Sequence, residues 1–286
     1  MSFFGSRIGV VAPSGIFNPD RLEQGIQHLE SWGYQIQKAP NLYAKHLSMA
    51  GTEAQRIEDF IWACNNPNID FIWYARGGYG TIQLLPALRN AITKPILGFS
   101  DATALGGYCS NLGNSYFYHA PVLHSLADLC DNTSQQHLKH FLSTGVLPRF
   151  PLSTLKTGQG STPVSGPLVG GNLCVITTAI GTPYQLKTQG CILMLEDIGE
   201  PAYKIHRMLT QLTLSGMLSE VKAIVLGCFT DCSSPQPYRI QDFILDALET
   251  LDIPIYEGAR FGHGTKNDIW NAGRVYTIKE SELYVE

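Results

Sequence analysis

The chain has 286 residues, 44% of them hydrophobic and 15% charged, which is enough for one large or two modest domains with a substantial core. Its formal net charge is −4 and it has no run of Lys or Arg, so no nucleic-acid partner is expected. The apolar stretches are only strand-length and the first seven residues do not resemble a signal peptide, so neither a membrane partner nor export is expected.

The first half of the chain alternates strand and helix patterns. The predicted strands cover 7–12, 34–38, 70–75, 95–99 and 116–118. The predicted helices cover 20–32, 52–66, a segment through 84–88, and 101–110. This alternation predicts an α/β fold with a parallel sheet and helices on both of its faces.

The second half is less regular. Pro, Gly, Ser and Thr accumulate between residues 146 and 166, and we interpret this stretch as a linker. Beyond it, helices are predicted at 173–180, 203–214 and 240–251, and strands at 191–195, 221–228 and, as a pair, within 274–285. The expected organisation is an N-terminal α/β domain over 1–145 and a mixed C-terminal α/β domain over 167–286.

The seven cysteines indicate the cellular compartment of the protein. Their number is odd and most lie in apolar runs, which is typical of free thiols in a reducing environment, so a cytoplasmic protein is expected. Cys228 and Cys232 are four positions apart, but no second pair accompanies them. We therefore expect no metal site.

The segment 94–105 carries the strongest local signal. An apolar strand pattern stops at Ser100 and a helical pattern follows at once, in the sequence Gly98-Phe99-Ser100-Asp101-Ala102. Such a strand-to-helix turn is typical of a nucleophile elbow, which exposes one hydroxyl beside backbone N–H groups. The alternative is that Ser100 only caps the following helix, since serine is a favoured N-cap.

A serine nucleophile needs a base. His263 stands between Gly262 and Gly264, which permit tight backbone geometry around one imidazole. His119 follows a predicted strand and is the second candidate. A purely structural role for both histidines remains open on the residues alone.

A carboxylate that orients the base is also required. The apolar run at 191–195 is followed by Glu196 and Asp197, and a strand that ends in a carboxylate suits that role. Alternatively, the two acids begin the next turn and cap the helix predicted at 203–214.

The turn Arg76-Gly77-Gly78-Tyr79-Gly80 follows another predicted strand. Its glycines let the backbone approach a ligand, and its N–H groups can bind an anion. The spacing matches neither a Walker loop nor a dinucleotide-binding loop, so an oxyanion-hole donor fits better than a phosphate site. A plain tight turn is the remaining interpretation.

Taken together, these motifs resemble the LD-carboxypeptidase family of serine peptidases, which includes muropeptide LD-carboxypeptidases and microcin C self-immunity proteins. The resemblance covers nearly the whole chain and keeps the order of the parts. The matching motifs are Arg76-Gly77-Gly78-Tyr79-Gly80, Gly98-Phe99-Ser100-Asp101-Ala102-Thr103, Gly170-Gly171-Asn172-Leu173, Leu195-Glu196-Asp197 with the segment 200–209, and Phe261-Gly262-His263.

The resemblance implies a Ser–His–Glu triad. Ser100 attacks, His263 acts as general base and then acid, and Glu196 orients His263. Glu200 is the competing third member; Glu196 is preferred because it is expected to end a strand, whereas Glu200 opens a helix.

The resemblance also implies how the site is assembled. The N-terminal domain would carry the nucleophile, the C-terminal domain would carry Glu and His, and the active site would lie between them. The implied oxyanion hole consists of the backbone N–H groups of Gly78 and Asp101. The family suggests a homodimer.

The implied reaction is hydrolysis of the amide between an L-configured centre and a terminal D-amino acid, as in a murein tetrapeptide ending in D-alanine. It requires no metal or organic cofactor. Such a small peptide substrate ends in a carboxylate, for which Arg76 and Arg260 are candidate partners unless they form scaffold salt bridges. Tyr79 and Asn172 are further candidate substrate-binding residues.

The alternative within the same fold is an immunity-type hydrolase that cleaves a peptidyl- or aminoacyl-nucleotide. Trp270 and Tyr79 could then stack on the base, unless they only pack. An ordinary ester hydrolase and a non-catalytic ligand-binding protein are the other readings, the last disfavoured because Ser, Glu and His are all present. The segment 265–273 departs from the family pattern, which leaves substrate contacts near His263 open.

Overall fold

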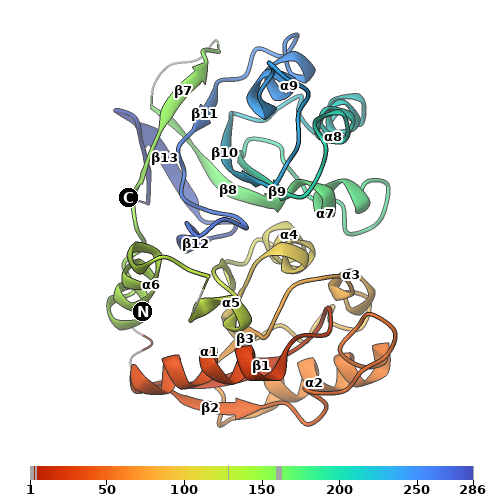
Figure 1. Ribbon diagram of the computed structural model, residues 1–286, viewed down its shortest axis with the longest axis vertical. Coiled ribbons are helices and arrows are strands. Elements are labelled where there is room, and N and C mark those ends of the chain that lie inside the picture. The colour runs from red at the N-terminus through yellow and green to blue at the C-terminus, as the bar shows by residue number, and fades with distance from the viewer. Residues whose placement is uncertain (1–2, 4, 128, 159–162, 286) are drawn as a thin grey trace.

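The structure is a computed structural model, and it describes residues 3, 5–127, 129–158 and 163–285. These residues form two β-sheets of six and eight strands, each packed against helices, one in each lobe of the molecule (Figure 1). The expected α/β fold is confirmed. Two predictions concern residues outside the described part. The absence of a signal peptide rests partly on residues 1–2 and 4, and the expected linker includes residues 159–162.

The first sheet has the strand order β12-β5-β4-β3-β1-β2. Its strands from β5 to β2 are parallel, and only β12 runs antiparallel to its neighbour β5. The strands are β1 (Arg7–Val11), β2 (Gln35–Lys38), β3 (Phe71–Tyr74), β4 (Ile96–Gly98), β5 (Phe117–His119) and β12 (Trp270–Asn271).

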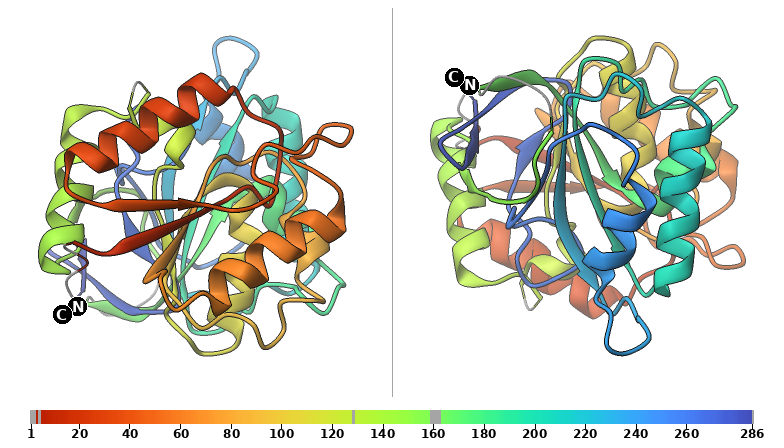
Figure 2. Two further views of the ribbon diagram at one scale, coloured as in Figure 1. Left: turned by 90° about the horizontal axis from the view of Figure 1, so that it is seen from below. Right: turned by 90° about the horizontal axis from the view of Figure 1, so that it is seen from above.

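Helices cover both faces of this sheet. Helix α1 connects β1 to β2 and α2 connects β2 to β3 on the other side of β1, so right-handed crossovers place them on opposite faces (Figure 2). The helices of this lobe are α1 (Pro19–Ser31), α2 (Glu53–Asn65), α3 (Thr81–Leu84), the 3-10 turn η1 (Ser100–Ala102), α4 (Thr103–Asn111), α5 (Leu123–Leu126) and α6 (Asn132–Thr144).

Local sequence accounts for these elements. Strand β3 consists of four buried apolar residues, as expected for a central parallel strand covered on both faces. Helix α1 buries Leu22, Ile26 and Leu29 on one stripe, and the side chain of Asn18 accepts hydrogen bonds from the first N–H groups of the helix.

The second sheet has the order β6-β14-β13-β8-β9-β10-β11-β7, with the four strands from β8 to β11 parallel. Three helices pack in this lobe: α7 (Leu173–Thr178), α8 (Ala202–Leu214) and α9 (Ile240–Ala247). The strands are β6 (Phe150–Pro151), β7 (Ser153–Lys156), β8 (Val164–Asn172), β9 (Ile192–Ile198), β10 (Ala223–Thr230), β11 (Ile255–Glu257), β13 (Val275–Lys279) and β14 (Glu282–Tyr284).

The stretch 146–166 differs from the linker that its composition predicts. In its described part it contributes β6, β7 and the start of β8 to the second sheet. Strands β6 and β7 are the two edge strands of that sheet, where proline and irregular composition are tolerated because one side of the ladder has no partner. A short edge strand therefore has the composition of a loop.

The C-terminal half also returns to the first sheet. Trp270 and Asn271 form β12 and pair with β5, so the chain between β11 and β12 crosses from one sheet to the other.

Among the helices of the described residues, none combines the length and the apolar character that a membrane span requires.

Candidate active site

Ser100 is the first residue of η1 and lies at the sharp turn that follows β4. Its backbone has φ +64°, a left-handed conformation that is uncommon for a residue with a side chain and that fits a nucleophile elbow. Neither η1 nor α4 has a side-chain cap, so the interpretation of Ser100 as a helix cap is wrong.

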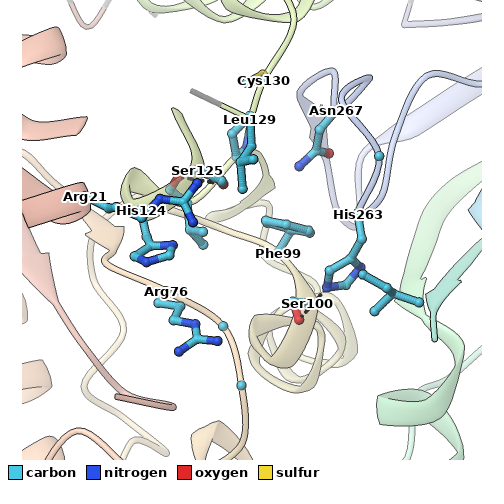
Figure 3. A pocket seen from close by; sticks show the side chains of 16 residues that line it. Arg21, Arg76, Phe99, Ser100, His124, Ser125, Leu129, Cys130, His263 and Asn267 are labelled. Carbon is cyan, nitrogen blue, oxygen red and sulfur yellow. Dashed lines mark hydrogen bonds between the residues drawn. The ribbon is translucent and has the colours of Figure 1, made fainter. Parts of the chain in front are cut away.

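The Ser100 hydroxyl instead faces His263. Its Oγ lies 2.9 Å from Nε2 of His263, and Nδ1 of the same ring lies 2.8 Å from Oε2 of Glu196 (Figure 3 shows the first pair). The backbone N–H of His263 also donates to Oε2 of Glu196, at 3.2 Å. The three residues form one hydrogen-bonded chain although Ser100 and His263 are 163 positions apart.

Glu196 is fully buried and lies within β9, two residues before the strand ends. The expectation that it ends a strand is therefore wrong, as is the helix-cap alternative, because α8 begins without a side-chain cap. The amide of Asn172 donates to Oε1 of Glu196 at 3.2 Å and to Asp197 at 3.0 Å. Burial raises the pKa of Asp197.

Two glycines give these groups room. Gly262 has φ +115°, and a Cβ there would lie 2.8 Å from Oε2 of Glu196. Gly171 has φ +131°, and a Cβ there would lie 2.5 Å from the hydroxyl of Thr103, which accepts a hydrogen bond from the N–H of Asn172. The Gly-Gly-Asn-Leu element thereby holds the second sheet against the helix that follows Ser100.

The competing candidates are placed elsewhere. Glu200 lies two residues before α8 and pairs at 3.2 Å with Lys204 on the first turn of that helix. His119 is fully buried between the rings of Phe99, Phe261 and Trp270, and neither of its ring nitrogens has a hydrogen-bond partner among the described residues. Burial, assisted by the nearby His263, lowers the pKa of His119 to about 3, so it remains a neutral packing residue.

The glycine-rich turn is fastened to the nucleophile by Asp101. The buried carboxylate of Asp101 accepts hydrogen bonds from Ser14 Oγ at 2.6 Å and from the N–H of Thr81 at 2.8 Å. Burial raises the pKa of this carboxyl. Arg56, also buried, donates to the carbonyl of Gly80 at 3.0 Å. Sequence reasoning missed Ser14 and Arg56, which carry no motif of their own.

A cavity of about 520 Å³ opens above Ser100 and His263. Figure 3 shows Arg21, Arg76 and His124 together on the side of Ser100 opposite His263. None of the described residues that line the cavity is an Asp or a Glu, so its electrostatic character favours anionic ligands. The sequence does not predict a role for Arg21, which lies in a helical pattern, or for His124, which follows a predicted strand, because a lone basic residue gives no signal of a cavity.

The remaining predicted substrate residues are distributed differently. Arg76 lines the cavity, and its guanidinium also donates to the carbonyl of Ile16. Tyr79 is 55% exposed and Asn172 supports Glu196; neither lines the cavity. The interpretation of Arg260 as a carboxylate anchor is wrong, because it lies outside the cavity and pairs with Asp131 and Asp268.

Trp270 is also unavailable to a ligand. Its ring is buried in the first sheet against His119 and Phe261, so a base-stacking pair of Trp270 with Tyr79 is not present. Within the described ranges, no group of three or more His, Cys, Asp or Glu side chains could hold a metal ion.

Models of two domains match the chain. Residues 8–119 match the LD-carboxypeptidase N-terminal domain and residues 165–278 match the LD-carboxypeptidase C-terminal domain. A putative carboxypeptidase of Synechocystis sp. is 35% identical, over 94% of this chain and 90% of that protein. A murein tetrapeptide carboxypeptidase of Pseudomonas aeruginosa is 31% identical, over 97% and 94%.

Solved structures share the fold. The microcin C7 self-immunity protein MccF, in complex with glutamyl sulfamoyl guanosine, superimposes with a TM-score of 0.88 at 21% identity, over 99% of this chain and 96% of that chain. A muramoyltetrapeptide carboxypeptidase from Oxalobacter formigenes gives a TM-score of 0.81 at 27% identity, over 96% and 97%.

Proposed function

This chain belongs to the LD-carboxypeptidase family, and we propose that it is a serine carboxypeptidase that hydrolyses the amide between an L-centre and a terminal D-amino acid. The proposed substrate is a murein tetrapeptide, from which the enzyme releases D-alanine during peptidoglycan recycling. The proposal includes a cytoplasmic homodimer in which domain 1–145 carries the nucleophile and domain 167–286 carries Glu196 and His263.

The observation that carries the proposal is the hydrogen-bonded chain from Ser100 through His263 to Glu196 at the floor of the cavity. With Nδ1–H donating to Glu196, Nε2 of His263 can accept the Ser100 proton as Oγ attacks the scissile carbonyl. His263 then returns the proton to the leaving D-alanine nitrogen. A water molecule, deprotonated by His263, hydrolyses the acyl-enzyme and regenerates Ser100.

The proposed oxyanion hole consists of the N–H groups of Gly78 and Asp101. Gly77 and Gly78 line the cavity beside Ser100, and a Cβ on Gly77 would lie 2.8 Å from Ser100 Oγ and 3.7 Å from the nitrogen of Asp101. The carboxylate of Asp101 also holds the N–H of Thr81, so the residue fixes the far end of the turn that contains Gly78.

The cationic side of the cavity supports a substrate with a free carboxylate. Arg76 is the first residue of the glycine-rich turn, directly before Gly77, and its guanidinium can form a charge-assisted hydrogen bond to a terminal carboxylate. The guanidinium of Arg21 and the imidazole of His124 supply further hydrogen-bond donors on the same side of the cavity. A peptide whose carboxylate is blocked would lose this interaction.

The second candidate is cleavage of a peptidyl- or aminoacyl-nucleotide. Microcin C7 self-immunity protein MccF of Escherichia coli is 27% identical over 92% of this chain, and solved MccF structures hold nucleotide-like ligands. The burial of Trp270 removes one of the two aromatic residues that would stack on a base here, which favours the peptide substrate.

The test is to incubate wild-type protein and Ser100→Ala with a murein tetrapeptide ending in D-alanine and to measure free D-alanine. We expect release by wild type only, and no release from the same peptide ending in L-alanine. Cleavage of an aminoacyl-nucleotide analogue without D-alanine release would contradict the peptide substrate and leave the triad in place. Equal release by Ser100→Ala would contradict the nucleophile.

A further inference from the structure

The residue His263 lies on the stretch of chain that crosses between the two sheets. Strand β11 belongs to the second sheet and β12 to the first, and residues 258–269 connect them (Figure 1). Ser100 follows strand β4 of the first sheet, whereas Glu196 lies in strand β9 of the second. The distance between Ser100 and His263 therefore depends on how this crossing loop is held.

Both ends of the loop are bound to the start of helix α6 in the first lobe. The guanidinium Nη2 of Arg260 donates to both carboxylate oxygens of Asp131, at 2.8 and 2.9 Å, and its Nε donates to Asp268 at 3.3 Å. Asp268 is fully buried, and its Oδ1 accepts a hydrogen bond of 2.5 Å from Ser134 Oγ. His137 contacts the other oxygen of Asp268 at 2.9 Å.

The backbone of the loop is tied at the same place. The N–H of Asn267 donates to Ser134 Oγ at 3.0 Å, and the N–H of Asp131 donates to the carbonyl of Thr265 at 2.9 Å. The side-chain oxygen of Asn267 accepts a hydrogen bond from the N–H of Gly262 at 3.2 Å, directly before His263. Asp131 is also the N-cap of α6, because it accepts a hydrogen bond from the N–H of Ser134 at 2.8 Å.

We propose that Asp131, Ser134, Arg260 and Asp268, here called the α6 clasp, are positioning residues that hold His263 in register with Ser100 across the two sheets. The inference rests on the proposed function of the triad. Without the guanidinium of Arg260, the buried carboxylate of Asp268 keeps the contacts of Ser134 and His137 but loses its one permanently charged partner among the described residues, so the loop would shift. The loop moves with its catalytic histidine because Gly262, Thr265 and Asn267 all lie within four positions of His263.

The clasp assigns a role to two features that the sequence left open. Arg260 is excluded from the substrate cavity by its ion pairs, and it acts on the reaction through the loop instead. The segment 265–273, which departs from the family pattern, supplies Asp268 to the clasp, and the backbone N–H of Asn267 in the same segment donates to Ser134 of the clasp.

The experiment compares wild type with Arg260→Met, Arg260→Lys and Ser134→Ala. Arg149→Met is the matched control, because Arg149 forms an exposed ion pair with Glu282 away from the site. The readouts are the second-order rate constant for labelling of Ser100 by a fluorophosphonate, kcat and KM for D-alanine release, and hydrogen exchange of residues 258–268. A permanently inactive fraction of the protein lowers the amplitude of labelling and leaves its rate constant unchanged.

We expect Arg260→Met to lower the labelling rate constant and kcat by roughly 10- to 100-fold, with KM within about twofold, because a displacement of about 1 Å at a catalytic group has effects of this size. Ser134→Ala, which removes one hydroxyl, tests the clasp if Arg260→Met does not fold. Arg260→Lys restores part of the rate, since it keeps the charge but loses the fork-shaped donor. Arg149→Met leaves all three readouts unchanged.

The clasp is overturned if labelling and loop exchange stay at wild-type values while only the melting temperature falls, which would show a purely structural role. It is also overturned if Arg260→Met raises KM at constant kcat, which would place Arg260 on the substrate. Failure of wild type to be labelled at Ser100 would contradict the triad. Hydrogen exchange of residues 258–268 in Arg260→Met would then still test the clasp, because faster exchange supports it and unchanged exchange overturns it.

Discussion

One carboxylate oxygen of Glu196 accepts hydrogen bonds from both the ring and the backbone of His263. The Oε2 atom lies 2.8 Å from Nδ1 and 3.2 Å from the backbone nitrogen of the same residue. This double contact fixes the orientation of the imidazole and selects the tautomer with hydrogen on Nδ1. Nε2 is then left as the acceptor for the Ser100 hydroxyl, as general-base catalysis requires.

Glu196→Gln is therefore expected to lower kcat by about 10²- to 10⁴-fold with KM little changed. The amide keeps the shape of the side chain but loses the charge that stabilises the imidazolium. The measurement is steady-state release of D-alanine. Glu200→Gln is the matched control, four residues on, and it should retain activity within about twofold; a loss as large as that of Glu196→Gln would contradict the assignment.

Gly77→Ala is expected to lower kcat/KM by at least about 100-fold. A Cβ at this position would lie 2.8 Å from both Cβ and Oγ of Ser100, so the nucleophile or the turn beside it must move. Gly107→Ala in α4 is the control, because its Cβ would meet only the flexible end of Leu186, at 3.3 Å. Wild-type labelling of Ser100 in Gly77→Ala would rule out this close approach.

Arg76→Met is expected to raise KM for a peptide ending in D-alanine by roughly 10- to 100-fold, the range of one hydrogen bond to a charged group. The same peptide ending in D-alaninamide should be hydrolysed poorly, and equally by wild type and variant. Kinetics on the two peptides provide the measurement. An equal increase in KM for acid and amide would mean that Arg76 shapes the cavity without binding the carboxylate.

The protein is expected to lose stability in acid partly through His119. Burial, with His263 nearby, lowers its pKa from 6.5 to about 3 in the folded state. Between about pH 6.5 and pH 3, His119 is therefore protonated in the unfolded chain and neutral in the folded chain. The free energy of unfolding falls as the pH is lowered through this range. Above it, His119 contributes no pH dependence.

His119→Phe removes this proton uptake. Between about pH 7 and pH 4.5, wild type should lose about 3 kcal/mol more unfolding free energy than the variant. Urea unfolding at the two pH values measures the difference, and Phe suits a site lined by Phe99, Phe261 and Trp270. Parallel pH dependences would show that His119 is protonated normally in the folded protein.

The sequence by itself determined the elements whose signals are local. The apolar run of β3 and the stripe of Leu22, Ile26 and Leu29 on α1 are predicted correctly. A strand that is buried on both faces is apolar at every position, and a helix that is buried on one face is apolar at every third or fourth position. Edge strands β6 and β7 were interpreted as a linker, because a strand with one unpaired side tolerates the residues of a loop.

Only the tertiary structure decided which side chains meet. Ordered motifs singled out Ser100, Glu196 and His263, but their hydrogen bonds join positions 67 and 163 apart, and no local pattern specifies such contacts. For the same reason the sequence leaves Arg260 open between a substrate ligand and a scaffold ion pair, and His119 open between a base and a structural residue. The fold pairs Arg260 with Asp131 and encloses His119 in aromatic rings, because side-chain chemistry is set by neighbours that the chain brings together from a distance.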